Sequence, residues 1–416
     1  MLKRRTGRGD STGEDAVVVC GAGAAGLAAA ISAARHGARV VLVEQCSELG
    51  GTVSGALIHT LAGFYDATGQ IMNDGLAREL TERLLHADAA TRCRKMSRLW
   101  VLNVCPNVYR RTIERWIAAE RRISVIHSAQ VIDLIRCGDR IEELTFSCPD
   151  GQKCIRPRAV VDATGSAQLV RLVDASLVLD DLPRAAGGWI FRIRGIDEHA
   201  LDFPKGVAVV RTIRMAARTG ELPPECAHAW LDSGVHADEA FVKLMLAPKG
   251  SWQDPRCLVQ TILQAERIQA AVLRFLQKLP EFTGAEITQT GRLGVRDGGR
   301  IRGRYTLTGD DVRAGRTFPD AVCRCDWPIE YWDGEKGVSL EYLPAGAHYE
   351  IPMRSLQLSG VQNLWAAGKC LSADREAHAS ARVVGTCWAM GEAAGAAAAR
   401  SFPNKEERQA HEHEYV

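Results

Sequence analysis

Three glycines near the start of the chain are spaced as Gly21-x-Gly23-x-x-Gly26, a pattern that can hold a phosphorylated ligand. The first glycine permits a tight turn, the second lets backbone approach a pyrophosphate, and the third lets a helix pack closely on a sheet. The N–H groups at that helix N-terminus attract phosphates. The spacing therefore predicts a dinucleotide-binding turn, although an isolated glycine motif is often only a tight turn.

The elements that flank this turn have the order that a dinucleotide site needs. An apolar run over 17–20 predicts a buried strand before the glycines, and the alanine-rich segment after them predicts a helix. A second strand over 39–43 leads to Glu44, which lies 18 residues after Gly26. A carboxylate at this place accepts hydrogen bonds from ribose hydroxyls and repels a 2′-phosphate.

Composition sets limits on the class of protein. The 416 residues are enough for two domains, and the 52 Lys and Arg residues nearly balance the 50 Asp and Glu residues. We therefore expect no nucleic-acid partner and no membrane partner, and no apolar run is long enough to span a bilayer. The thirteen cysteines are odd in number and many lie in expected strands or helices, which indicates reduced thiols and a cytoplasmic location.

Two other features could signal a metal site or an export sequence. Cys323 and Cys325 lack a second cysteine pair at zinc spacing, so we interpret them as loop thiols and expect no metal. Residues 1–14 are polar and basic, and no apolar run follows them before the first strand. They predict a disordered extension rather than a secretory signal.

Further along the chain, segments typical of a nucleotide-binding fold flank one long segment that is not. A buried strand over 159–162 ends in Ala163-Thr164-Gly165, and another over 363–367 ends at Gly368. A small β-meander is expected from strands at 123–127, 129–136 and 141–148. Residues 180–345 do not continue the alternation of strands and helices that is typical of a nucleotide-binding fold. A helix is expected there at 258–279, and strands are expected at 189–193, 207–211 and 285–289.

Two segments in the C-terminal half could contact a ligand. Four arginines crowd one short stretch and could clamp a carboxylate or phosphate, or could equally form a solvated loop; they are Arg296, Arg300, Arg302 and Arg304. The Ala- and Gly-rich stretch 385–400 predicts a helix that packs closely on the sheet and directs its positive N-terminal dipole toward whatever lies above.

Several of these segments together resemble the bacterial FAD-dependent oxidoreductase family of the glutathione-reductase-like, two-dinucleotide-fold flavoproteins. They are GAGAAG, EQCSELGGT, VVDATG, RDGGRIRGRYTLTGDDVRAGRTFPDAV, HYEIPMRSL and NLWAAGKCLSADREAHASARVVGTCWAMGEAAGAAAA. The resemblance covers the chain from Ala16 to about Ala399 and implies FAD as the cofactor. It implies an α/β fold, in which a Rossmann-like FAD-binding domain with a parallel sheet and a β-meander carries an inserted α+β substrate domain.

This resemblance divides the chain and assigns residues to the cofactor. The expected FAD-binding domain is 15–60, 105–180 and 346–402, the substrate or cap domain is 61–104 and 181–345, and 403–416 is a flexible tail. The expected FAD contacts are Gly21, Gly23, Ala24, Ala25, Gly26, Glu44, Gln45, Gly50, Gly51, Thr52, Val131, Ala163, Thr164, Gly165, Gly368, Lys369, Gly385 and Thr386.

Departures from related families narrow the chemistry. No cysteine follows the Gly-Gly pair over 52–59, which disfavours disulfide reduction. The third flavin motif reads Gly368-Lys369 where aromatic hydroxylases usually have Gly-Asp, so a hydroxylase is not indicated. The stretch 326–329 shares only fragments of a flavin-halogenase pattern.

Three residues are candidates for catalysis. His378 is expected in a loop beside the flavin, where an imidazole can take a proton as hydride leaves; its alternative is packing. Arg382 can hold an anionic substrate or the flavin, or can form a salt bridge. His59 follows the Gly-Gly loop and can approach the flavin, even covalently, although packing is the more ordinary role. Tyr305, Tyr349 and Arg354 are reserve candidates for the substrate wall.

The leading hypothesis is an FAD-dependent dehydrogenase or oxidase that transfers hydride from a small polar organic substrate to flavin N5. The absence of a second GxGxxG motif indicates reoxidation by oxygen or an external carrier. The alternatives are a flavin monooxygenase with a diffusible reductant, and a flavin-bound, non-catalytic subunit of a larger complex. Whether the chain forms a homo-oligomer or joins a partner subunit stays open.

Overall fold

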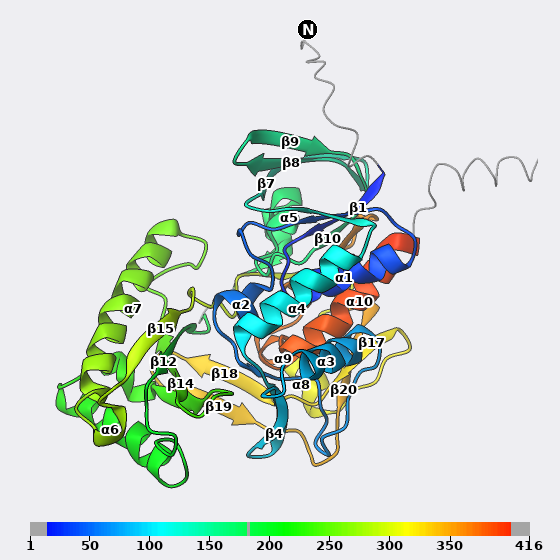
Figure 1. The fold of residues 1–416 in the computed structure, drawn as a ribbon. Coiled ribbons are helices and arrows are strands. Elements are labelled where there is room, and N and C mark those ends of the chain that lie inside the picture. The colour runs from blue at the N-terminus through cyan, green and yellow to red at the C-terminus, as the bar shows by residue number, and fades with distance from the viewer. Residues whose placement is uncertain (1–14, 181–183, 401–416) are drawn as a thin grey trace, which may run out of the picture.

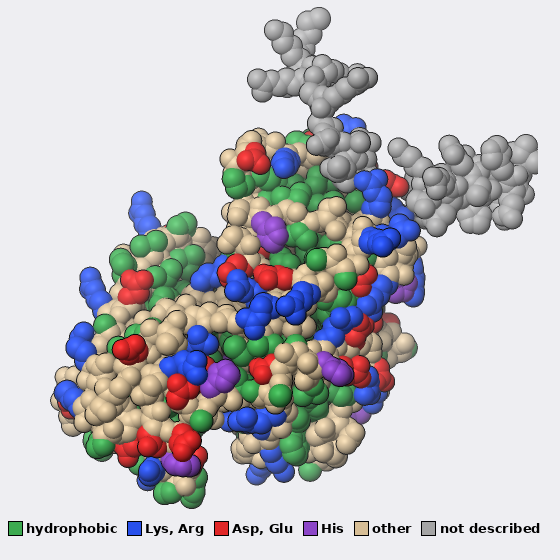
Figure 2. All heavy atoms as spheres, viewed as in Figure 1, with side chains coloured by type: hydrophobic (Ala, Val, Ile, Leu, Met, Phe, Trp, Pro, Cys, Tyr) green, Lys and Arg blue, Asp and Glu red, His purple; other side chains and the backbone are tan. Residues whose placement is uncertain are grey.

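The computed structural model describes residues 15–180 and 184–400. The extension expected at 1–14 and the tail expected at 403–416 lie outside the described residues. Figure 1 shows a larger body that contains β1, α1 and α10, and a smaller part at the left that contains α6, α7, β12, β14 and β15. Basic and acidic side chains are interspersed on both parts of the face shown in Figure 2.

A five-stranded parallel sheet forms the centre of the larger body, in the order β21-β10-β1-β2-β6. Its strands are β1 (Ala16–Cys20), β2 (Val40–Val43), β6 (Ile123–Ile126), β10 (Pro157–Asp162) and β21 (Leu364–Ala366). In its middle Val18 is paired with Val160 on one side and Val41 on the other. These strands read as continuous apolar runs because both faces of a parallel sheet are covered. The predicted α/β fold is confirmed.

Two helices rich in small residues cover one face of this sheet side by side (Figure 1). They are α1 (Ala24–Arg35) and α10 (Val384–Arg400). A Cβ atom on Gly391 would lie 2.1 Å from the Ala25 carbonyl oxygen, and one on Gly395 would lie 2.2 Å from that of Ala29. The two backbones therefore touch directly, which explains why both helices need glycine and alanine. The helices α3 (Leu76–Ala87) and α4 (Pro106–Ala119) join the same hydrophobic core.

The β-meander differs in one strand from its prediction. It consists of β7 (Gln130–Cys137), β8 (Arg140–Cys148) and β9 (Gly151–Ile155), and it lies at the top of Figure 1. The strand expected at 123–127 forms as β6, but it extends the parallel sheet instead of the meander. Its buried partner is Val40–Val43, and a meander strand would lack that cover.

The smaller part is an antiparallel sheet in the order β13-β14-β12-β15 with two helices packed on it. These elements are β12 (Gly187–Arg194), β13 (Trp230–Ser233), β14 (Glu239–Leu246), β15 (Glu286–Thr290), α6 (Lys205–Thr219) and α7 (Pro255–Leu276). The strand predicted at 207–211 is wrong, because this segment belongs to α6. Its buried side chains, Val209, Val210, Ile213, Ala216 and Ala217, recur at helical rather than alternating spacing.

Shorter elements complete the fold. They are β3 (Thr60–Leu61), β4 (Arg92–Met96), β5 (Leu99–Asn103), β11 (Val178–Leu179), β16 (Arg300–Ile301), β17 (Ala321–Cys325), β18 (Ile329–Asp333), β19 (Gly337–Glu341), β20 (Tyr349–Pro352), α2 (Gly51–Gly55), α5 (Gln168–Val173), α8 (Gly309–Arg313) and α9 (Arg375–Ala381). Cys323 and Cys325 are buried in β17, so their interpretation as loop thiols is wrong. All thirteen cysteines have free thiols.

The hydrophobic cores bear on the domain division, which stays a prediction. One core joins α1 and α10 with segments from 61–104 and from 307–329. A separate core contains buried residues between Trp189 and Ala285. Among the helices of residues 15–180 and 184–400, none is both long and apolar enough to cross a bilayer.

Candidate active site

The expected cofactor motifs meet at one edge of the parallel sheet. Gly21 follows β1, Glu44 follows β2, Ala163 follows β10, and Gly368 comes shortly after β21. Parallel neighbours end at the same edge, and ligands of open α/β sheets bind outside the carboxyl ends of the strands. Segments from opposite ends of the sequence are thereby brought to one place.

The glycine turns at this edge lie in direct backbone contact. A Cβ atom on Gly21 would lie 2.4 Å from the Ala163 carbonyl oxygen, and Gly21 has a φ of +97°, which favours glycine. A Cβ atom on Gly26 would lie 1.7 Å from the Gly21 carbonyl oxygen. A Cβ atom on Gly51 would lie 2.7 Å from the Cα atom of Gly23. The Gly-x-Gly turn and the Gly-Gly pair therefore form one narrow cradle.

The cradle fits the diphosphate and ribose of FAD. A Cβ atom on Gly23 would meet the Cα atom of Gly51 at an ordinary contact distance of 3.8 Å, so there is room above this turn. Gly23 and Ala24 stay partly exposed, while Ala22 and Ala25 beside them are buried. Glu44 is buried, and its carboxylate accepts hydrogen bonds from the backbone N–H groups of Ala22 (2.6 Å) and Cys46 (2.9 Å). This fixed carboxylate retains lone pairs for ribose hydroxyls.

Two buried residues that sequence reasoning missed hold the Ala163-Thr164-Gly165 turn. The Asp162 carboxylate accepts hydrogen bonds from the Thr164 hydroxyl (2.7 Å) and from the backbone N–H group of Leu169 (2.9 Å). Burial raises the pKa of Asp162, and these hydrogen bonds oppose the rise. The Cys370 thiol accepts from the N–H group of Gly165 at 3.2 Å. Asp162 lies within the VVDATG motif, so its position beside the turn was a usable signal.

The other expected cofactor residues have mixed surroundings. Gln45 is exposed, Thr52 and Gly165 are partly exposed, and Gly50 and Gly368 are buried at positive φ.

The Val131 side chain is buried in the core, and its carbonyl accepts from Gln168 at 3.5 Å. The Gly385 N–H group donates to the Ala62 carbonyl (2.9 Å), and the buried Thr386 hydroxyl donates to Cys325 (3.5 Å). Contacts within the chain thus already engage both residues at the start of α10. Their role toward FAD stays a prediction.

Lys369 turns its side chain across the cofactor edge toward the neighbouring loop. Its ammonium group donates a hydrogen bond to the Val295 carbonyl at 2.8 Å, and its Cε atom lies 2.7 Å from a Cβ atom placed on Gly165. Burial lowers the pKa of Lys369. The aspartate of related motifs is replaced here by a cation that links the sheet edge to residues 295–297.

His378 lies in a helix, which corrects the loop expected there. It belongs to α9, whose N-cap Asp374 accepts from the Ala377 N–H group at 2.8 Å. The imidazole is 2% exposed, and its Nε2 atom lies 3.0 Å from the Lys369 carbonyl oxygen. A carbonyl can only accept, so Nε2 carries the proton and Nδ1 is the acceptor of the neutral ring. Burial lowers the pKa of His378 to about 4, so the ring is neutral near pH 7.

Charged groups from two separate segments of the chain surround His378. Asp297 attracts its protonated form, whereas Arg382 and Arg300 oppose it. Asp297 also forms an ion pair with Arg300 at 3.1 Å. Burial raises the pKa of Asp297, but the nearby positive charges outweigh burial and hold the pKa below its usual value. Asp297 was missed from the sequence, although it follows the first residue of the arginine cluster.

Two arginines of the site lie against strand β18. The Arg382 guanidinium donates to the Glu330 carbonyl at 3.4 Å, and that of Arg296 lies 4.0 Å from the centre of the Trp332 ring. Arg296 also donates to the Ala186 carbonyl at 2.6 Å. Burial is the main cause that lowers the pKa of both arginines, and for Arg296 the charge of Arg382 adds to it.

His59 lies apart from this group in a cluster of its own. It is fully buried, its ring stacks on Phe241 at 3.8 Å, and its Nε2 atom lies 3.5 Å from a carboxylate oxygen of Asp232. Lys243 and Arg94 pair with the same carboxylate at 3.2 and 2.6 Å. Burial lowers the pKa of His59 to about 4. These contacts describe a packed residue, and a catalytic or covalent role for His59 stays untested.

The reserve candidates are engaged in internal contacts. Tyr349 is fully buried, and its hydroxyl lies 2.8 Å from that of Ser380. Tyr305 donates to Asp311 at 2.8 Å, and Arg354 pairs with Asp320 at 3.0 Å.

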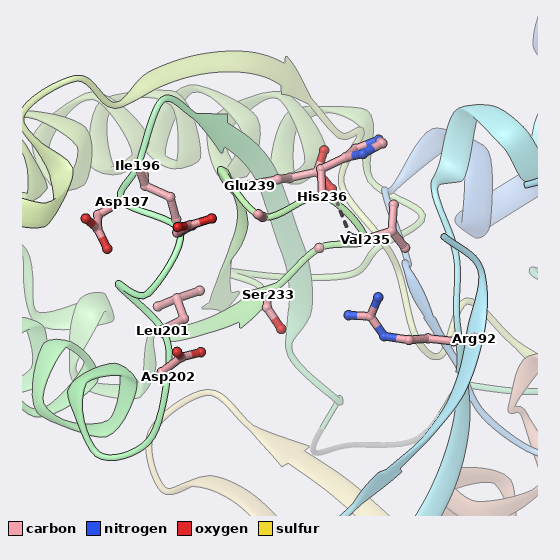
Figure 3. A pocket seen from close by; sticks show the side chains of 12 residues that line it. Arg92, Ile196, Asp197, Leu201, Asp202, Ser233, Val235, His236 and Glu239 are labelled. Atoms are coloured by element: carbon pink, nitrogen blue, oxygen red, sulfur yellow. Dashed lines mark hydrogen bonds between the residues drawn. The ribbon is translucent and has the colours of Figure 1, made fainter. Parts of the chain in front are cut away.

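A separate cavity of about 290 Å³ lies where the smaller part meets β4 (Figure 3). Figure 3 shows the carboxylates of Asp197, Asp202 and Glu239 around it and Arg92 on the opposite side. None of the residues that line it belongs to the expected site. Within the described ranges, no group of three or more His, Cys, Asp or Glu side chains is arranged to hold a metal ion.

The chain is similar to several solved structures at low identity. A geranylgeranyl bacteriochlorophyll reductase-like protein from Thermoplasma acidophilum is 12% identical with a TM-score of 0.49, over 96% of this chain and 80% of that one. The probable FAD-dependent monooxygenase pqsL from Pseudomonas aeruginosa is 13% identical with a TM-score of 0.42, over 93% and 85%. At these values the likeness carries no functional argument.

The family comparison is more decisive. No curated protein sequence matches the chain significantly. The model of the FAD dependent oxidoreductase family, however, matches residues 16–410, which is nearly the whole chain. The match includes every strand of the parallel sheet and the complete cradle at its edge. FAD is therefore the cofactor of this enzyme, and the chain belongs to the FAD-dependent oxidoreductase family.

Proposed function

We propose that this enzyme is a dehydrogenase or oxidase that takes hydride from a small polar organic substrate. We also propose that its cofactor domain is of the glutathione-reductase type. The observation that carries the proposal is the meeting of His378 with Asp297 and Arg382 next to Lys369 of the cofactor edge. Buried titratable groups with shifted pKa values that face a cofactor edge are candidates for catalysis.

The residues of the cradle would hold the cofactor. Gly21, Gly23 and Gly51 leave room for the diphosphate, and the Glu44 carboxylate would accept from the ribose. Bound FAD supplies hydride acceptance at N5. The protein then needs to place a substrate and remove its proton.

His378 is the proposed proton acceptor. Its ring is neutral near pH 7, and the hydrogen bond from Nε2 to the Lys369 carbonyl leaves Nδ1 as the basic atom. Asp297 stabilises the imidazolium that forms, because it attracts the protonated ring. Arg382 limits that stabilisation and would orient an electron-rich substrate group.

The proposal extends to the partners of the reaction. Oxygen or an external carrier would accept the electrons, and no nucleic acid or membrane partner is needed. We place the protein in the cytoplasm because its thirteen thiols are all free. Assembly as a homo-oligomer, or with a partner subunit, is compatible with this function.

The test is a spectroscopic experiment on the purified protein. The visible spectrum before and after denaturation shows whether flavin is bound and whether it is covalent. Anaerobic addition of candidate metabolites should bleach the flavin without NADH or NADPH. Air should then restore the oxidised spectrum of an oxidase, whereas a dehydrogenase would need an added carrier.

Other outcomes would support the alternatives. Rapid NADH or NADPH consumption in stopped flow would indicate a monooxygenase with a diffusible reductant. A bound flavin that no metabolite reduces would indicate a non-catalytic subunit. Either result would overturn the proposed hydride transfer.

A further inference from the structure

Arg296 and Arg382 are half-buried, and they differ from Arg300 beside the site in how their charge is balanced. Each donates a hydrogen bond to a backbone carbonyl, Arg296 to Ala186 and Arg382 to Glu330. Within residues 15–180 and 184–400, neither guanidinium has a carboxylate at ion-pair distance. Each guanidinium carries five N–H donors, so most of them are left for a ligand.

Packing fixes both groups in place. Arg296 lies over the Trp332 ring, and Arg382 is anchored on Glu330, which is two residues earlier on β18. Both contacts are with the same short strand, two residues apart, so the two guanidiniums lie near each other. The charge of Arg382 also contributes to the lowered pKa of Arg296, in agreement with this proximity. Two like charges held together in a half-buried place favour binding of an anion.

The local charges indicate which anion fits. Glu330 acts on both guanidiniums, whereas Asp297 acts on Arg382 and is also paired with Arg300. The Glu330 carboxylate is held by the Trp327 indole at 3.0 Å. Lys369 adds a further positive charge, which Arg382 opposes, so the local cations outnumber the carboxylates. A planar carboxylate matches both this surplus and the fork of an arginine.

We propose that Arg296 and Arg382 bind the carboxylate of a small carboxylic acid substrate, beside His378. The inference rests on the proposed function, because it names the substrate class of that site. Arg382 is the C-cap of α9, and its backbone N–H group donates to the His378 carbonyl at 3.3 Å, so a carboxylate held by Arg382 would lie near the proton acceptor.

The experiment measures binding of simple probes to the FAD-loaded protein. Acetate and benzoate are titrated against it, with acetamide and benzamide as neutral controls, and binding is followed by calorimetry and by perturbation of the flavin absorption. We expect each carboxylate to bind at least ten times more tightly than its amide. Equal binding of acids and amides would overturn the proposal.

Variants assign the binding to the two guanidiniums. Arg296→Met and Arg382→Met should each weaken benzoate binding at least tenfold, while Arg296→Lys should retain part of it. The matched control is Arg302→Met, because Arg302 is exposed and bonds to the Ser176 carbonyl at 3.1 Å; it should leave binding unchanged. Melting temperatures and flavin content show that each variant is folded and loaded.

Two results separate this inference from its neighbours. If Arg382→Met shifts the flavin midpoint potential but leaves benzoate binding unchanged, the guanidinium serves the cofactor and the inference is overturned. If benzoate binds as expected but no metabolite reduces the flavin, the anion site stands and the proposed hydride transfer fails.

Discussion

Two buried clusters in this enzyme each contain a histidine that burial keeps neutral, yet they are balanced differently. In the His59 cluster, the Asp232 carboxylate pairs with Lys243 and Arg94 and lies beside His59, and these partners hold its pKa far below the usual range despite burial. In the His378 cluster, Arg296 and Arg382 bond to backbone carbonyls instead of carboxylates of the described chain. A closed network stabilises a fold, whereas uncompensated charge leaves room for a ligand.

The largest effect is expected from removing the central carboxylate of the His59 cluster. Asp232→Asn leaves Lys243 and Arg94 without their counter-charge, so the free energy of unfolding should fall by about 3 kcal/mol. Urea denaturation measures the loss. The matched control is Asp238→Asn, whose exposed pair with Arg194 at 2.7 Å should contribute less than about 0.5 kcal/mol. Similar small losses in both variants would erase the distinction between the clusters.

A substitution in the His378 cluster should change the rate of flavin reduction more than the stability of the fold. His378→Gln removes the proton acceptor, so flavin reduction by any compound that reduces the unmodified enzyme should slow by roughly 100-fold. Anaerobic stopped flow measures this rate, with His199→Gln as an exposed control. An unchanged rate with full flavin content would show that His378 is only packed.

Both clusters contain a buried histidine with a lowered pKa, so the stability of the protein should depend on pH. Each histidine has a folded pKa of about 4, below its unfolded value near 6.5, so the unfolded chain binds more protons between these values. The stability contributed by the neutral rings is present above pH 6.5 and is lost as pH falls toward 4. For each histidine, the free energy of unfolding should fall by about 2 kcal/mol between pH 7 and pH 5.

The measurement compares unfolding free energies at these two pH values. In His59→Gln, the decrease in unfolding free energy from pH 7 to pH 5 should be smaller by about that amount. A decrease equal to that of the unmodified protein would contradict the buried, neutral state of His59.

The smallest effect is expected away from both clusters, at the backbone-held carboxylate. Glu44→Gln replaces one acceptor by a donor next to the Ala22 and Cys46 N–H groups and weakens the expected ribose contact. Affinity for FAD should fall by about tenfold, the effect of losing one charge-assisted hydrogen bond. Fluorescence titration of the apoprotein measures it, and Glu48→Gln is the neighbouring control.

The nucleotide-binding half of the fold could be predicted from the sequence because local rules govern it. Gly21 and Gly51 are required by backbone geometry, and the apolar runs at 17–20 and 159–161 are typical of a buried parallel sheet. Periodicity failed where helix and strand compete for a short apolar run, as at 207–211.

The charged part of the site could be predicted only in fragments. His378 and Arg382 were found because they lie close together in sequence near a motif. Asp297 and Glu330 reach them through tertiary packing from segments about 50 to 80 residues away, and no local spacing marks that meeting. The uncompensated charge of Arg296 depends on which carboxylates of the described chain pack near it, and only the three-dimensional arrangement reveals that.

The contact between α1 and α10 has a consequence for synthesis on the ribosome. Four of the five parallel strands are complete once Asp162 has emerged, but β21 and the helix that lies on Ala25 and Ala29 come from the last part of the described chain. Until then, the alanine face of α1 remains exposed and the cradle edge lacks Gly368 and Lys369. FAD loading should therefore be a post-translational event, and nascent chains that stall before Val384 should be targets for chaperones.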